Sequence, residues 1–344
     1  MSEPTRNRRR VTAADVAREA GVSQSAVSRV FTEGASVSGR MDARVREAAE
    51  RLGYRPNVLA RSLITGRTRI IGLVVAYLDN PFYPDAIEKL SAALQEEGYH
   101  LLIFTTGRTE MDVDRIFQEL MDYRVDGIIA ASINLSGDLA KRCREAGMPV
   151  VLFNRGTDQG GISAVTSDNV AGGRMVAEFL LRGGHRRLAH IAGWEASSTG
   201  RDRLQGFRDH LKGAGRPLMY VADGAYDRHR ASEAARFLMG QAVPPDAIFV
   251  ANDHMALAVM DCLRHDLGLR VPEDVSIVGY DDVPMAGWPS YDLTTVRQPT
   301  RRMVEASVAE LMRLIAAPAR QATTTRIDGP LVVRGSARLP EDRT

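Results

Sequence analysis

The chain has 344 residues, of which 44% are hydrophobic and 26% charged, a composition typical of a soluble globular protein with two or three domains. Its net charge of +2 is unevenly distributed, because residues 1–68 carry 13 Arg and no Lys against 7 acidic residues, while the remainder is net −4. A basic head on a mildly acidic body favours a nucleic-acid-binding module joined to a second function over a uniformly charged binding protein.

The termini and the cysteines exclude several protein classes. The first residues are polar and Arg-rich, with no apolar signal segment, and no apolar run is long enough to cross a membrane. Cys143 and Cys262 lie far apart and fit no metal or redox spacing. We therefore expect a cytoplasmic protein with reduced thiols, no metal site and no membrane partner.

Residues 11–31 predict two short helices joined by a tight turn. Thr12 is a good N-cap, with Asp15 three positions later, and Gly21 is the residue that a left-handed helix end prefers. Ser23 can cap the second helix, which runs to Phe31. This pattern indicates a helix-turn-helix, although an ordinary surface hairpin of two helices would look similar.

The second helix has two distinct faces. Its apolar stripe consists of Ala26, Val27, Val30 and Phe31, and its polar face consists of Gln24, Ser25, Ser28 and Arg29. Short hydrogen-bonding groups and one guanidinium are suited to reading base edges in a DNA major groove. We expect Arg29 to contact a base, with Gln24 and Ser25 setting sequence preference.

A third helix is predicted over residues 40–52, capped by Ser38 and followed by Tyr54 and by Pro56, which stops further helix. The stretch Asn57–Leu63 could form about two helical turns, too few to be stable alone in water. It is therefore either a flexible linker or a segment that folds only with a partner.

From residue 69 onward, strands and helices alternate. Continuous apolar runs such as 70–78 and 125–132 are typical of buried parallel strands, and amphipathic segments such as 85–98 and 203–215 are typical of the helices between them. The pattern predicts two successive doubly wound α/β units with a boundary near residues 167–168. We expect the helix 301–315 to return to the first unit and residues 331–338 to rejoin the second.

Polar and aromatic residues follow the predicted strand ends, where ligands of parallel sheets bind. They include Asp79, Asn80, Phe82, Tyr83, Asn154, Arg155, Trp194, Asn252, Asp253, Asp281 and Asp282. Arg203 opens a predicted helix, and Trp288 and Gln298 lie in later loops, all of which the fold would bring near the same cleft. Carboxylates and amides bond hydroxyl groups, and aromatic rings stack on the apolar faces of sugar rings. The alternative for each residue is a helix cap or a turn. No nucleophile elbow, zinc motif or phosphate-binding loop is present, so we expect neither an enzyme nor a cofactor.

The run DVAREAGVSQSAVSRV, followed by GYRPN at 53–57 and ARSL at 60–63, resembles the headpiece of the lactose-repressor (LacI/GalR) family of bacterial transcription regulators, and the likeness extends over nearly the whole chain. Two departures are Ala26, where the family usually has Thr, and Thr32, where Asn is common. The resemblance implies a headpiece over 1–56, a hinge helix and linker over 57–68, and a bilobed core over 69–344 that resembles periplasmic sugar-binding proteins. The first lobe would comprise about 69–168 and 299–327, and the second about 169–298 and 328–344.

The resemblance also implies residue roles. The DNA-contacting set is Thr12, Ser23, Gln24, Ser25, Ser28, Arg29, Tyr54, Asn57, Ala60 and Leu63, with Leu63 entering the minor groove from a paired hinge helix. The effector-binding set is Phe82, Asn154, Arg203, Asp253 and Asp281, with Asn80, Arg155, Trp194, Asn252, Trp288 and Gln298 as further candidates.

The sequence thus predicts a homodimeric repressor that binds a pseudo-palindromic operator under the control of a small molecule, a sugar or sugar derivative. Alternatives are a regulator of the same fold that answers to a protein partner or has no effector, a sugar-binding transport protein, and an enzyme with an accessory DNA module. The missing signal segment and the headpiece argue against transport, and the cleft offers binding groups but no catalytic pair. No heptad tail follows the core, which favours a dimer over a tail-assembled tetramer.

Overall fold

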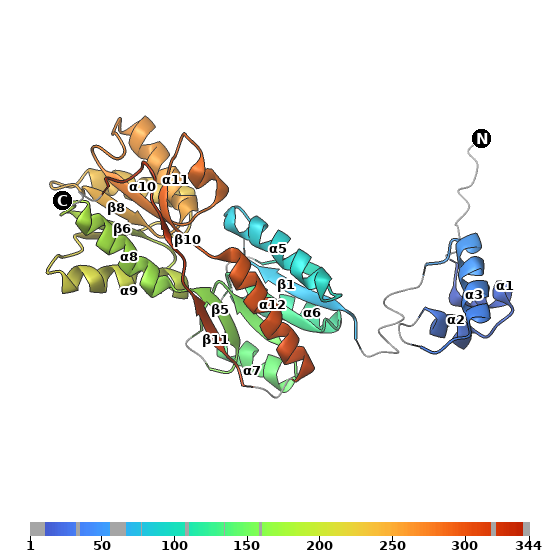
Figure 1. Ribbon diagram of the computed structural model, residues 1–344. Helices are drawn as coiled ribbons and strands as arrows, with labels where there is room; N and C mark the ends of the chain where they lie inside the picture. Colours follow the sequence, from blue (N-terminus) through green and yellow to red (C-terminus); the bar gives the residue numbers. More distant parts are fainter. Residues whose placement is uncertain are drawn as a thin grey trace, which may run out of the picture. The chain divides into compact units, whose positions relative to one another are not determined.

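A computed structural model describes residues 11–31, 35–55, 67–76, 78–106, 110–133, 135–157, 160–317 and 321–339 (Figure 1). The chain forms two compact units, residues 1–69 and 70–344. Thr32 and the expected hinge segment with Asn57, Ala60 and Leu63 lie outside the described residues.

The first unit is a headpiece of three helices: α1 (Ala13–Ala20), α2 (Gln24–Val30) and α3 (Gly39–Leu52). Thr12 and Asp15 form a reciprocal capping box, and Gly21 ends α1 in the left-handed conformation with φ 62°. The Ser23 hydroxyl accepts a hydrogen bond from the Ala26 N–H at 3.2 Å. Each such cap stabilises its helix by about 1 kcal/mol. Ser38 stands at the N-cap of α3, but its side chain makes no capping bond, contrary to expectation.

The headpiece has a small hydrophobic core of its own. Its buried members come from all three helices: Val16, Ala17, Ala20, Val27, Val30, Val45, Ala48 and Ala49. The rings of Phe31 and Tyr54 pack at its edge with centroids 5.9 Å apart. The apolar stripe predicted for α2 therefore faces the other two helices, which leaves its polar face outward.

The first lobe of the core contains a six-stranded parallel sheet in the order β11-β5-β4-β3-β1-β2. The strands are β1 (Ile70–Val75), β2 (His100–Thr105), β3 (Gly127–Ala131), β4 (Val150–Phe153), β5 (Ser163–Ser167) and β11 (Thr324–Ile327). One face is covered by α5 (Phe82–Glu96) and α12 (Thr300–Ala316), which run side by side, and the other by α6 (Glu110–Asp122) and α7 (Gly137–Glu145) (Figure 1).

The second lobe repeats this plan, with the strand order β12-β10-β9-β8-β6-β7 and only β12 antiparallel to its neighbour. The strands are β6 (Leu188–Ala192), β7 (Tyr220–Asp223), β8 (Ala247–Val250), β9 (Ser276–Asp281), β10 (Thr294–Arg297) and β12 (Leu331–Val332). The helices are α8 (Asn169–Arg182), α9 (Ser198–Gly213), α10 (Arg228–Met239) and α11 (Asp253–Asp261), the last followed by a π-helical turn, Cys262–Asp266. The predicted bilobed α/β fold is confirmed.

The chain passes between the lobes three times: from β5 into α8, from β10 into α12, and from β11 into β12. Consequently α12 packs on α5 and β4 in the first lobe, whereas β12 pairs with β10 in the second. These crossings place the carboxyl ends of the central strands of both sheets on either side of one cleft, which Pro81 and Phe82 line from the first lobe and Asp281 and Gln298 from the second.

Two glycines allow α8 and α9 to approach closely. A Cβ at Gly173 would lie 2.1 Å from the Arg203 carbonyl oxygen, and one at Gly206 would lie 2.0 Å from the Val170 carbonyl oxygen. Gly173 and Gly206 therefore serve helix packing, and this packing fixes where the α9 side chains enter the cleft.

Among the described residues, no helix combines the length and the apolarity that crossing a lipid bilayer requires.

Candidate functional site

The outward face of α2 carries Gln24, Ser25 and Arg29 as exposed side chains, with Ser28 half-buried. Arg18, Arg46 and Arg51 are held by carboxylates at 3.4, 2.8 and 3.2 Å, whereas Arg29 has no ion-pair partner among the described residues. An exposed, unengaged guanidinium is available to a phosphate or a base edge.

The remaining described members of the DNA-contacting set have structural roles as well. Thr12 and Ser23 are helix caps, and the Tyr54 ring packs on Phe31. Ala26, where the family usually has Thr, is buried. As DNA contacts, all of these residues stay predictions.

Nine of the eleven predicted effector residues converge at the carboxyl ends of the strands that face the interlobe cleft. They are Asn80, Phe82, Asn154 and Arg155 from the first lobe, and Arg203, Asn252, Asp253, Asp281 and Gln298 from the second. Each is at most 5% exposed. We call this set, with the groups bonded to it, the cleft cluster.

Arg203 and Asp281 form a buried ion pair, with Arg203 Nη2 and Asp281 Oδ1 3.5 Å apart. Arg203 Nε also donates a hydrogen bond to Asn169 Oδ1 at 2.9 Å, and Arg203 Nη1 donates one to the Ala251 carbonyl oxygen at 2.5 Å. Its Cζ lies 3.6 Å from the centre of the Tyr280 ring. The guanidinium is therefore fixed by an anion, two neutral acceptors and an aromatic face.

Asp281 lies where β9 turns sharply, and both Asp281 and Asp282 have positive φ, 127° and 58°. Asp282 is held by Arg297 at 2.6 Å and by Arg334 at 2.7 Å, which stabilises this strained corner. Burial raises the pKa of Asp281, while Arg203 and hydrogen bonds from Gln298 and Asn80 act in the opposite direction. Because Asn80 belongs to the first lobe, groups from both lobes lower the pKa of this carboxylate against the effect of burial.

Asn252 and Asp253 are engaged within the second lobe. Asn252 caps α11 by accepting from the Met255 N–H at 3.0 Å. The Asp253 carboxylate accepts from the Thr295 hydroxyl at 2.6 Å and the Val283 N–H at 3.0 Å. Burial, together with the negative charges of Asp281 and Asp282, raises the pKa of Asp253 to about 7. The side chains of both residues are thus engaged in hydrogen bonds within the second lobe. That they contact an effector stays a prediction.

Arg155 extends from the end of β4 in the first lobe to the start of α9 in the second. Its Nη1 donates to the Ser197 and Thr199 hydroxyls, the latter at 3.1 Å. Its Nη2 donates to the Ser132 carbonyl at 3.2 Å and hydroxyl at 3.1 Å. Every acceptor is neutral, and Arg155 Nε has no partner.

Two amides in the cluster also have an unpartnered atom. Asn154, with φ 54°, donates Nδ2 to the Tyr83 hydroxyl at 3.3 Å, but its Oδ1 accepts no hydrogen bond. Gln298 donates Nε2 to Asp281 at 2.7 Å, and its Oε1 likewise accepts none. Two acceptors and one donor, drawn from both lobes, are therefore buried and unengaged.

Sequence reasoning did not single out Ser132, Ser197, Thr199 and Tyr226, which belong to the cluster. The Ser197 hydroxyl lies 2.8 Å from that of Thr199 and 3.3 Å from that of Tyr226. Ser132 and Ser197 follow β3 and β6, so the strand-end criterion could have found them. The Tyr226 ring has room because residue 193 is Gly, where a Cβ would lie 2.1 Å from it.

The predicted aromatic contacts divide into buried and exposed ones. Phe82 stacks on Phe153 at 6.3 Å and meets Tyr83 edge-on at 5.2 Å, so its ring is part of the cleft wall. Trp194 is 41% exposed and Trp288 is 54% exposed. No ring contact or side-chain hydrogen bond joins either tryptophan to the cleft cluster among the described residues, so the geometry does not support them as contacts.

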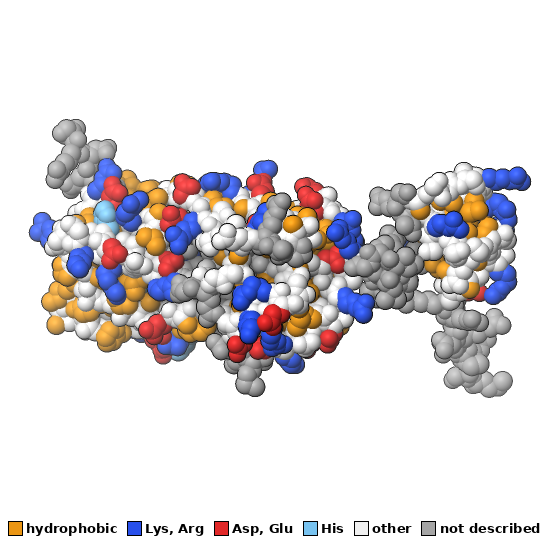
Figure 2. Space-filling model, turned by 90° about the horizontal axis from the view of Figure 1, so that it is seen from below, with side chains coloured by type: hydrophobic (Ala, Val, Ile, Leu, Met, Phe, Trp, Pro, Cys, Tyr) orange, Lys and Arg blue, Asp and Glu red, His pale blue; other side chains and the backbone are white. Residues whose placement is uncertain are grey.

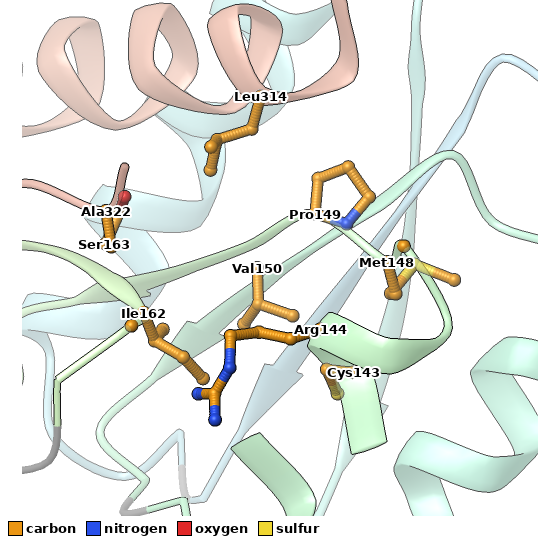
Figure 3. Close-up of a pocket in the computed structure, with 11 residues that line it drawn as sticks. Cys143, Arg144, Met148, Pro149, Val150, Ile162, Ser163, Leu314 and Ala322 are labelled. Atoms are coloured by element: carbon orange, nitrogen blue, oxygen red, sulfur yellow. The ribbon is translucent and has the colours of Figure 1, made fainter. Parts of the chain in front are cut away.

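Two hollows adjoin the first lobe. A groove of about 420 Å³ opens onto Phe82, Asp281 and Gln298 beside the starts of α5 and α12. Another, of about 230 Å³, lies at the amino ends of β4 and β5, where Val150, Ile162 and Leu314 line it with the Arg144 side chain beside them (Figure 3). Ligands of parallel sheets bind at the carboxyl ends, which favours the groove at the cleft.

Surface charge differs between the two units. On the face drawn in Figure 2, basic and acidic side chains are interspersed over the core, whereas the headpiece shows mainly basic ones. Among the described residues, no group of three or more His, Cys, Asp or Glu could hold a metal ion.

Comparison with known proteins adds two family matches. A family described as bacterial regulatory proteins, lacI family, matches residues 12–57, and a periplasmic binding protein-like domain matches residues 177–337. The chain is 36% identical over 340 residues to the HTH-type transcriptional regulator CelR of Thermobifida fusca, covering 96% of this chain and 99% of CelR. It is 32% identical over 328 residues to the ribose operon repressor of Escherichia coli K12, covering 94% and 98%.

Solved structures of similar proteins cover nearly the whole chain. The lac repressor dimer bound to operator and the anti-inducer ONPF superimposes with a TM-score of 0.86 at 26% identity, covering 95% of this chain and 99% of that one. The complex of the transcriptional regulator CelR with cellobiose has a TM-score of 0.71 at 34% identity, covering 95% and 100%.

Proposed function

The chain belongs to the LacI family of bacterial regulatory proteins, and we propose that it is a sequence-specific DNA-binding transcription repressor controlled by a small hydroxylated molecule, a sugar or sugar derivative, bound between the lobes of its core. The observation that carries this proposal is the cleft cluster, a buried set of polar side chains contributed by both lobes. Relatives named as regulators, one of them solved with cellobiose, support it.

The unengaged atoms of the cluster indicate what the ligand supplies. Asn154 Oδ1 and Gln298 Oε1 need donors, and Arg155 Nε needs an acceptor. A buried polar atom without a partner costs about 1–3 kcal/mol. Hydroxyl groups both donate and accept, so a polyhydroxylated ligand can satisfy all three while its apolar ring face meets Phe82.

The headpiece would supply DNA binding, with α2 in the major groove and Arg29 at a base edge. We expect a homodimer on a pseudo-palindromic operator, as in the lac repressor dimer bound to operator. A cytoplasmic location and the lack of a catalytic role are parts of the same proposal. Effector closure of the cleft would change the separation of the two hinge segments 57–63, and so bias their folding on DNA.

DNA recognition is tested with Arg29→Ala and a control, Arg18→Ala, which removes an exposed arginine of the same headpiece. An operator is first selected from random duplexes with the full chain. Arg29→Ala should weaken binding to the selected site by about 1–3 kcal/mol and binding to random DNA much less, whereas Arg18→Ala should affect both alike. Equal losses on both DNAs for Arg29→Ala would leave it a phosphate contact.

Effector control is tested by calorimetry and operator binding across a panel of mono- and disaccharides. Asp281→Asn should weaken binding of the active sugar by about 1.5–3 kcal/mol without weakening sugar-free DNA binding. The control is Asp274→Asn, which breaks an exposed pair with Arg270 in the same lobe. Unaltered sugar affinity in Asp281→Asn would place the binding site elsewhere.

A further inference from the structure

Arg155 and Arg203 are the two arginines buried in the part of the chain that the structure describes, at 2% exposure each. Arg203 faces the Asp281 carboxylate. Arg155 faces only two serines and a threonine, through their hydroxyls and one carbonyl, and forms no ion pair with any described residue. A guanidinium taken out of water without an anion is unfavourable, because neutral acceptors replace its hydration but not a counter-charge.

The charges of the cleft cluster do not balance when the ligand is left out. Arg203 and Asp281 neutralise each other, and Asp253 is bonded to Thr295 and Val283, away from Arg155. Burial and its acidic neighbours raise the pKa of Asp253 to about 7, so it carries less than a full negative charge at neutral pH. Arg155 is therefore the arginine of the cleft that has no counter-ion bonded to it among the described residues.

The surroundings of Arg155 have the chemistry of an anion site. Ser197 is the N-cap of the sixteen-residue helix α9, so the helix begins where the Arg155 guanidinium ends. A helix N-terminus carries a partial positive charge that favours anions. The hydroxyls of Ser197, Thr199 and Tyr226 lie within 3.4 Å of one another and can rotate to donate to a bound oxyanion.

Two unpartnered polar atoms also point to a ligand, independently of the N-terminus of α9. Arg155 Nε is a buried donor without an acceptor, and Asn154 Oδ1, on the adjacent residue, is a buried acceptor without a donor. An anionic oxygen next to a hydroxyl group satisfies both at once. A neutral sugar would satisfy the hydrogen bonds and leave the charge of Arg155 unpaired.

We propose that the effector is a hydroxylated acid, a sugar bearing one carboxylate or phosphate, whose anionic group pairs with Arg155 at the N-terminus of α9 while its hydroxyls bond Asn154 and Gln298. This inference rests on the proposed function, because it names the ligand class of the same interlobe site. Arg203 and Asp281 then bind the uncharged part of the ligand.

The test compares acids with their neutral parents in calorimetry on the full chain at constant ionic strength. The pairs are glucuronate with glucose, galacturonate with galactose, glucose 6-phosphate with glucose, and ribose 5-phosphate with ribose, so that carboxylate and phosphate are separate arms. At least one acid should bind about tenfold or more tightly than its parent. Arg155→Gln should abolish that preference, whereas Arg144→Gln, an exposed arginine of the same lobe, should preserve it.

Asn154→Asp gives a second readout, because it places a resident carboxylate beside Arg155 at a backbone position that Asp tolerates. The variant should have a higher Tm than the parent protein without ligand, and its affinity for the preferred acid should fall by about tenfold or more. A lower Tm together with an unchanged preference for the acid would overturn the role of Arg155.

The remaining outcomes separate this inference from the proposed function. If sugars bind but no acid binds more tightly than its neutral parent in any pair, the anionic effector is disproved while the sugar-controlled regulator stands. If no member of either series binds, the acidic effector is disproved, and the disaccharides of the panel above decide whether the proposed function stands. If an acid binds equally well to Arg155→Gln, its charge is recognised elsewhere, and the pairing with Arg155 is wrong.

Discussion

The two lobes of the core share a strand order and a helix arrangement, yet they neutralise their buried arginines differently. In the second lobe Arg203 has Asp281 as a permanent counter-ion, and in the first lobe Arg155 has only neutral acceptors. The fold therefore fixes where a side chain enters the cleft, whereas individual neighbouring residues decide its charge state. The second-lobe arginine thus has its counter-ion within the chain, whereas the first-lobe arginine has none among the described residues.

The interiors of the two lobes also differ in the ionisable side chains that they bury. Among the described residues of the first lobe no histidine is buried, and its core around Val74, Phe117 and Leu120 includes Cys143. The core of the second lobe encloses His190, fully buried between Phe207 and Phe249, with ring centroids 6.2 and 4.8 Å away. Burial lowers the pKa of His190 to about 3. We therefore expect the second lobe to respond to mutation and to acid more strongly than the first.

The largest effect should come from Arg203→Leu. This change leaves the Asp281 carboxylate buried without its counter-ion, which costs about 3–5 kcal/mol of unfolding free energy. Urea unfolding followed by fluorescence measures the loss. Adding Asp281→Asn to the same chain should restore most of it, and strictly additive losses in the double variant would mean that the pair is not coupled.

His190→Leu should change how stability depends on pH. In the folded protein His190 stays neutral down to about pH 3, whereas in the unfolded chain it takes up a proton below about pH 6.5. The contribution of His190 to the free energy of unfolding is thus fully present above pH 6.5. On acidification it falls by about 1.4 kcal/mol per pH unit, so at pH 5 about 2 kcal/mol has been lost.

Unfolding by urea between pH 5 and pH 8 measures this contribution, and His190→Leu should flatten the curve over that range. The matched control is His229→Leu, since His229 is 80% exposed on α10. An unchanged slope in His190→Leu would mean that His190 is protonated in the folded protein.

Arg155→Leu should have a smaller effect on the unliganded protein, below about 2 kcal/mol, because no carboxylate is left unpaired. The Ser197 and Thr199 hydroxyls, 2.8 Å apart, can bond each other once the guanidinium is gone. The same urea assay measures it beside Arg203→Leu. Equal losses for the two arginines would contradict the contrast between the lobes.

The smallest effect should come from Trp288→Ala. Because Trp288 is 54% exposed, its removal should change stability by less than about 0.5 kcal/mol and leave effector affinity unaltered. Calorimetry with the active ligand measures the affinity. A tenfold loss would show that the exposed edge of the second lobe, rather than its buried residues, holds the ligand.

The sequence predicted most of the fold because buried parallel strands are continuous apolar runs, as in Ile70–Val75. It missed β10 and β11, which are four residues each and rich in Thr, so that only their neighbours identify them as strands. It also predicted that α9 begins at Arg203, whereas the helix begins five residues earlier, at Ser198, with Ser197 as its N-cap.

The residues of the site could be predicted where they directly follow a strand that the sequence also predicts. That criterion found Asn154, Arg155 and Asp281, all of which lie in the cleft cluster. It could not show which arginine has a carboxylate partner, because that depends on contacts between residues far apart in the chain. Ser197 and Thr199 were missed because small hydroxyl residues are common in loops and gain significance only from what they touch.

The three crossings between the lobes have a consequence for how the protein is made. Neither lobe is a contiguous stretch of chain. After residue 299 the chain adds α12 and β11 to the first lobe and β12 to the second. On the ribosome the headpiece, with its own core, leaves first and can fold early. Both lobes must wait for the same late segment, so the DNA-binding module is finished before the part that senses the ligand exists.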